Sequence, residues 1–212
     1  ALSMAADKTL WLRLAGTHDY GANNHSGTCN VGVVSSDKRF VQTLGYMTST
    51  GEIKVLSSAE MPALSPSTTY SLNSTLVTDV HSRPWIGTPT GVAVRNGNGS
   101  WENFTLWTAQ TTALAIGQDQ RTIIAAANNG ELATILSDGR VNMLPSLPEP
   151  AYYLAMGSNT IWASTDNAVY QLSNTTWSKI TDSSSALPIA AKDANLFVGR
   201  ADELTLYQPN TA

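Results

Sequence analysis

Charged residues and cysteine are both scarce in this 212-residue chain. Asp, Glu, Lys and Arg make up 13% of it, about half the share in an average soluble protein, and the net charge is −4. The 12 Lys and Arg residues are scattered, with Lys38-Arg39 as the only adjacent pair, so no concentrated basic face is available for nucleic acid. Cys29 is the only cysteine, which excludes a disulfide within the chain.

Long apolar runs and helical periodicity are also missing. No stretch approaches the roughly 20 apolar residues that a bilayer-spanning helix needs, so we predict no membrane span. No long window carries a helical apolar period either, so helix content should be small. Ala1, rather than methionine, begins the chain, which fits either removal of a secretion signal or a trimmed domain.

Short strand patterns separated by turn formers run along the chain instead. Residues 9–14 alternate apolar with other side chains, which is the period of a half-buried strand, and a similar segment follows at 39–44. Asn129-Gly130 and Asp138-Gly139 favour hairpin turns, because these residues tolerate positive φ.

An internal repeat organises these segments. Residues 83–94 align without gaps with residues 160–171, 77 positions later, so that Trp85 falls on Trp162. A weaker copy lies between them and another follows. The period of about 35 to 40 residues is the length of one four-stranded propeller blade.

The repeat predicts an all-β fold, a single small β-propeller domain over residues 1–212. Inner strands are expected near residues 31, 75, 113, 152 and 187, which gives five blades. The last copy is one strand short, and we expect the N-terminal strands to complete this last blade and so remove its exposed edge. If the first 30 residues form a blade of their own, the count becomes six.

One copy of the repeat resembles a known propeller family. The segment 83–105 is similar to the blade repeat of two-component-regulator propellers at Trp85, Gly87, Thr88, Gly91, Val92, Trp101, Phe104 and Thr105. The resemblance implies a ligand-sensing role outside the cytoplasm. Segments 188–191 and 204–208 are similar to fungal fucose-type lectin propellers, although the arginine and glutamate that contact the sugar in those lectins have no clear counterparts here.

The candidate ligand-binding residues are those that depart from the repeat and carry useful chemistry. The recurring tryptophans are expected to pack between blades, whereas Trp11 and Trp107 lie outside the strict repeat and can present rings to a sugar. Arg83 offers a planar donor fork, and His81 offers a titratable donor or acceptor. We therefore predict a ligand site built from His81, Arg83 and Trp107.

A metal site is the second possibility. His18 and His25 share one inserted segment with Cys29, and imidazole and thiolate groups are preferred ligands of Cu and Zn. The hypothesis is that His18, His25 and His81 converge on one copper or other transition-metal ion. Solvated histidines in a surface loop explain the same residues.

Signals for catalysis are weak, since the chain has no nucleophile elbow, phosphate-binding loop or zinc-protease motif. We predict a secreted or cell-surface protein that recognises a glycan or a small extracellular molecule. A copper-binding surface protein and a propeller lyase or hydrolase are the alternatives, and an enzyme is less favoured. Glycosylation acceptor sequences, which fit a eukaryotic secreted glycoprotein or an Asn-rich bacterial surface protein, occur at Asn24, Asn73, Asn98, Asn103 and Asn174.

Overall fold

The computed structural model describes residues 1–18, 39–64, 75–158 and 160–208, and its strands form five antiparallel sheets, which we call blades 1 to 5. Blade 1 contains β1 (Leu2–Met4), β2 (Leu10–His18), β3 (Arg39–Met47) and β4 (Ile53–Val55). Blade 2 contains β5 (Leu76–Thr78), β6 (Pro84–Thr88), β7 (Gly91–Arg95) and β8 (Trp101–Thr105). Blade 3 contains β9 (Thr111–Ile116), β10 (Thr122–Ala127), β11 (Leu132–Leu136) and β12 (Val141–Leu144). Blade 4 contains β13 (Tyr153–Met156), β14 (Ile161–Ser164), β15 (Ala168–Ser173) and β16 (Thr176–Asp182), and blade 5 contains β17 (Ile189–Lys192), β18 (Asn195–Gly199) and β19 (Leu204–Tyr207).

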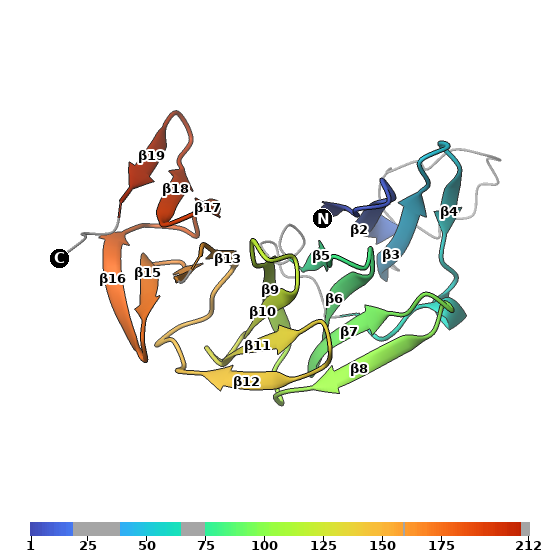
Figure 1. Cartoon of the computed structure of the whole chain (residues 1–212), viewed down its shortest axis with the longest axis horizontal. Helices are drawn as coiled ribbons and strands as arrows, with labels where there is room; N and C mark the ends of the chain where they lie inside the picture. Colours follow the sequence, from blue (N-terminus) through green and yellow to red (C-terminus); the bar gives the residue numbers. More distant parts are fainter. Residues whose placement is uncertain (19–38, 65–74, 159, 209–212) are drawn as a thin grey trace.

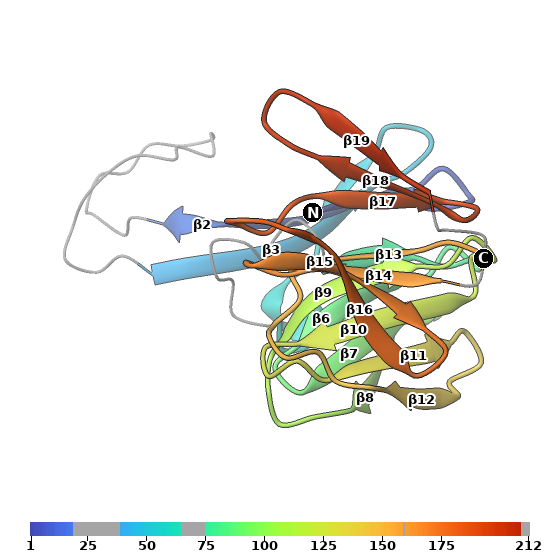
Figure 2. The same ribbon diagram turned by 90° about the vertical axis from the view of Figure 1, so that its left-hand side faces the viewer.

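The blades follow one another around an arc (Figure 1). Their first strands contact one another in chain order, β1 with β5, β5 with β9, β9 with β13 and β13 with β17. Figure 2 shows the same arc from the side, with blade 5 at the upper end and the outer strands of blades 2 and 3 at the lower end. In Figure 1 the first and last blades stand apart, so the described strands form an open arc.

The blades are held together by apolar faces that pack on one another. Side chains alternate between the two faces of a strand, so one residue type recurring in each blade can fill the same junction. Trp85 and Trp162 do so, at 0% and 2% exposed, as the repeat predicts. Trp11 holds the same place on β2 and is 5% exposed, so it belongs to the repeat rather than departing from it.

The hairpins also repeat. The turn between the first and second strands of a blade contains one residue in the left-handed region, with φ between 55° and 67°, at Lys8, Ser82, Gln120 and Asp193. Such a residue gives a short connection the twist that the flanking strands require. A left-handed residue therefore recurs in the first hairpin of blades 1, 2, 3 and 5, although the loops differ in length: Asp193 and Ala194 alone join β17 to β18, whereas residues 5–9 join β1 to β2.

The predicted all-β propeller and its count of five blades are confirmed. The inner strands expected near 75, 113, 152 and 187 correspond to β5, β9, β13 and β17. In the part of the chain that is described, helical structure is confined to one 3-10 turn, Ser58–Glu60, and no helix is long and apolar enough to cross a membrane.

The expected closure of the last blade by the N-terminal strands is wrong. β1 and β2 pair with each other, and β2 pairs along its whole length with β3, which lies beyond residues 19–38. This nine-residue ladder commits the N-terminal strands to blade 1, and blade 5 is left with three strands. The inner strand of blade 1 is therefore β1 and not a segment near residue 31, which lies outside the described residues.

Gly91 tests the packing of blade 2. Its φ is +153°, and a Cβ built on it would lie 2.0 Å from the carbonyl oxygen of Phe104. We expect Gly91→Ala to lower the free energy of unfolding by about 2 kcal/mol or more, because the neighbouring strand would have to move. Gly97→Ala is the control, since nothing lies within 4 Å of a Cβ there. Urea unfolding of both variants measures this, and equal stability of the two would contradict the described register.

Candidate functional site

Asp79 organises the turn that carries two of the predicted ligand residues. Its carboxylate is 1% exposed and accepts backbone N–H bonds from His81 and Arg83, at 2.9 and 3.0 Å. The indole Nε1 of Trp85 donates to the same carboxylate at 3.0 Å. A buried carboxylate that accepts several hydrogen bonds stabilises the backbone around it, and this one fixes the hairpin before β6.

The guanidinium of Arg83 is used inside the protein. Its Nε donates to Asp79 at 2.8 Å, its Nη2 lies 2.7 Å from the same carboxylate, and Nη2 also donates to the carbonyl oxygen of Ser137 at 2.6 Å. Ser137 lies in the turn between β11 and β12, so Arg83 joins blade 2 to blade 3. The donor fork predicted to bind a ligand therefore serves a contact between blades.

The structure does not bring His81, Arg83 and Trp107 together. Trp107 is 5% exposed, and its backbone N–H donates to Thr90, at the far end of β6 from Arg83. A five-residue strand separates the two ends by about 15 Å. His81 is exposed, whereas the side chain of Arg83 is only 20% exposed.

The metal hypothesis falls largely outside the described residues. His25 and Cys29 belong to the segment 19–38, and of His18 only the backbone, at the end of β2, is described. Among the residues that are described, no group of three or more His, Cys, Asp or Glu side chains is placed to hold a metal. Convergence of His18, His25 and His81 stays a prediction.

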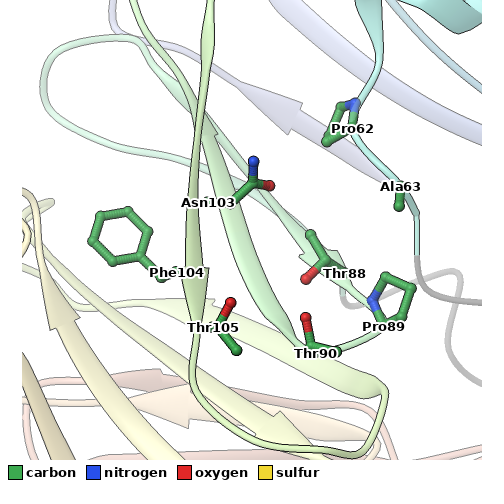
Figure 3. Close-up of a pocket in the computed structure, with 8 residues that line it drawn as sticks. All are labelled: Pro62, Ala63, Thr88, Pro89, Thr90, Asn103, Phe104 and Thr105. Atoms are coloured by element: carbon green, nitrogen blue, oxygen red, sulfur yellow. The ribbon is translucent and has the colours of Figure 1, made fainter.

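A cavity of about 450 Å³ opens on blade 2 (Figure 3). Three parts of the chain line it: Pro62 and Ala63 from the connection between blades 1 and 2, Thr88, Pro89 and Thr90 from the β6–β7 turn, and Asn103, Phe104 and Thr105 from β8. Its size lies within the range of small-molecule sites.

Strand register aims polar groups into this cavity. Thr88 pairs with Gly91, and Gly91 pairs with Thr105, so both threonines lie in one row, with a residue that has no side chain between them. Figure 3 shows the side chains of Asn103 and Thr105 on the cavity side of β8 and the ring of Phe104 on the opposite side. That ring stacks on Trp85 at 5.5 Å between centroids, which fixes the direction of its neighbours on the strand.

The cavity is rich in hydrogen-bonding groups and uncharged. No ionisable side chain is among its described lining residues. Among the described residues, no hydrogen bond occupies the side chains of Thr88, Asn103 or Thr105. Prolines supply apolar surface beside these groups. The arrangement can bind an uncharged molecule with hydroxyl groups, and its described lining residues include no titratable group that could transfer a proton.

These lining residues were not recognised as a site from the sequence. Thr88 and Thr105 were identified as repeat positions, and Asn103 was identified as a glycosylation acceptor. A signal was present, since three threonines and three asparagines, Asn103 among them, occur at and between repeat positions in residues 88–105. Their convergence depends on the pairing of β6, β7 and β8, which a motif alone does not give.

Comparison of the whole chain with known proteins gives a likeness of fold. No protein-family model matches the sequence, and no curated protein matches it. Virginiamycin B lyase from Staphylococcus aureus, a β-propeller, is 13% identical, with a TM-score of 0.59 over 99% of this chain and 69% of that chain.

Two further structures widen the range of functions among the neighbours. The extracellular domain of a hybrid two-component system from B. thetaiotaomicron is 16% identical, with a TM-score of 0.64 over 100% of this chain and 27% of that chain. A chain of the mitotic checkpoint complex is 9% identical, with a TM-score of 0.65 over 99% of this chain and 62% of its own. Since one fold serves such different proteins, the likeness establishes the propeller and leaves the function to the site.

Asp79→Ala tests the structural role of the turn before β6. The substitution leaves the partly buried Arg83 without its counter-ion and several donors without an acceptor, so we expect a loss of about 3–5 kcal/mol in the free energy of unfolding. Asp138→Ala is the matched control, because it breaks an ion pair with Arg140 whose side chains are 54% and 76% exposed, and it should change stability little. Urea unfolding of both variants measures this, and an equal loss of unfolding free energy in the two would contradict the role assigned to Asp79.

Proposed function

We propose that this protein is a recognition propeller that acts outside the cytoplasm and binds a neutral glycan or a similar uncharged, hydroxyl-bearing molecule. The observation that carries the proposal is the cavity on blade 2. Its described lining residues offer threonine hydroxyls and one amide that bond no other described group, beside proline surfaces and without a charged side chain. Sugars present hydroxyl groups at their edges and C–H groups on their faces, and both kinds of surface are matched there.

The surroundings of the cavity support the same proposal. The chain has few charged residues, and a solved extracellular domain of a two-component system shares its fold. The resemblance of residues 83–105 to two-component-regulator propellers covers the strands that build the cavity. The fold is also shared with a lyase, but at 13% identity this does not transfer an activity.

Binding to an array of neutral and acidic glycans tests this function, with titration calorimetry on any glycan that is bound. We expect a neutral glycan, and we expect Thr105→Val and Asn103→Ala each to weaken binding about five- to tenfold, the effect of one lost hydrogen bond. Thr175→Val, on the exposed hairpin between β15 and β16, is the matched control and should bind as the unaltered protein does. Binding only of acidic glycans, or full affinity in both cavity variants, would contradict the proposal.

A further inference from the structure

Blade 1 turns one apolar face of its sheet away from every other described blade. Residues paired directly across antiparallel strands lie on the same face, and two rows of pairs cross this blade with apolar side chains only. We call this surface the blade 1 face; it consists of Leu2, Leu12 and Val55 in one row around Gly45, and of Met4, Leu10, Met47 and Ile53 in the other. Its four residues on the two edge strands are between 61% and 70% exposed.

Blade 5 also has an apolar face, on the side of its sheet that points away from blade 4. We call this surface the blade 5 face; it consists of Ala190, Phe197 and Leu206 in one row, and of Pro188 and Leu204 around Gly199 in the other. Leu204 is 69% exposed and Leu206 is 49% exposed. The other side of the same strands packs on blade 4, through Leu196 and Val198.

The three interior blades bury both of their faces. In blade 2, Ile86 and Ala93 pack toward blade 1, and Trp85 and Val92 pack toward blade 3. Of the nine large apolar side chains exposed in the described residues, six belong to the blade 1 face or the blade 5 face. Apolar surface gathered in this way marks an interaction site rather than ordinary scatter.

The two uncovered faces are the two halves of one junction. At every junction within the chain, the forward side of one blade, which points to the following blade, packs on the backward side of that following blade. The blade 5 face is a forward side, and the blade 1 face is a backward side. They cannot meet in one molecule as it is described, because they lie at opposite ends of the arc (Figure 1).

We infer that the protein associates head-to-tail with a second copy of itself, with the blade 5 face of one copy packed on the blade 1 face of the next. A second copy is the occupant because it carries the matching face, in the kind of contact that four internal junctions already make. The residues that make up the two faces are uncharged. Lys192, two residues after Ala190 on β17, lies at the edge of the blade 5 face and is exposed, so its ammonium group can stay in water while the apolar rows are buried. Each added copy leaves one face of each kind free, so association continues unless the copies close a ring.

Sedimentation velocity of the 212-residue chain tests this, over about 1 to 200 μM to follow mass action. We expect the average mass to rise with concentration from the 22.6 kDa of one chain to multiples of it. Ile53→Asp on the blade 1 face and Leu204→Asp on the blade 5 face should each stay at one chain. Val141→Asp is the matched control, because it alters an exposed apolar residue on β12 of an interior blade, and it should associate as the unaltered chain does.

Mixing the two variants gives the sharper result. Ile53→Asp retains an intact blade 5 face and Leu204→Asp retains an intact blade 1 face, so an equimolar mixture should form a complex of two chains and stop there. The mixture also shows that both variants are folded, since an unfolded variant could not complement the other.

Four results would overturn the inference. The unaltered chain could remain at 22.6 kDa at every concentration, or the mixture could remain at the mass of one chain. Association of Leu204→Asp alone would show that two blade 1 faces pair with each other, which is a symmetric contact and not a head-to-tail one. Protein isolated from its host with a different polypeptide on these faces would likewise exclude the second copy.

Discussion

The packing of one apolar sheet face on the next holds this protein together. A propeller blade has few contacts other than those with its neighbours, so its two faces decide its place in the chain. Here the tryptophans at positions 11, 85 and 162 fill successive junctions from the second strand of their blades. Ala125 on β10 is one of the small buried side chains in the junction between blades 2 and 3. Each interior blade is stabilised by neighbours on both faces, whereas in the described part of the chain blades 1 and 5 each pack on a neighbour through one face only.

The sequence predicted the repeating part of this fold and failed at its ends. The period located β5, β9, β13 and β17, because the blades repeat the same strand pattern at a regular spacing. The pairing of β2 with β3 was not predictable in this way, since residues 19–38 separate the two strands and the part up to residue 30 has no counterpart in the other copies. Closure by the N-terminal strands was expected because it removes an edge, but β1 finds a nearer partner in β2.

The candidate site shows a different limit. His81 and Arg83 were chosen for their chemistry, yet Arg83 is occupied by Asp79 and by a carbonyl group 54 residues away at Ser137. Composition cannot reveal such a partner, because only the packing of blade 2 on blade 3 brings it near. The cavity residues were overlooked for a different reason. In the sequence Thr88 and Thr105 are only repeat positions, and it is the strand register that places them in one row with Gly91. The sequence therefore shows which residues have useful chemistry, but it does not show which groups they contact in the folded protein.

The open arc is the central claim, and oxidation of methionines by hydroxyl radicals tests it most directly. Met4 lies on the blade 1 face and is 61% exposed, and Met143 lies on an interior blade and is 48% exposed, so one residue type reports both environments. At a dilution that keeps the chain in single copies, the open arc predicts that Met4 is oxidised at least as fast as Met143. Protection of Met4 while Met143 reacts would show that the first and last blades meet, and it would contradict the open arc.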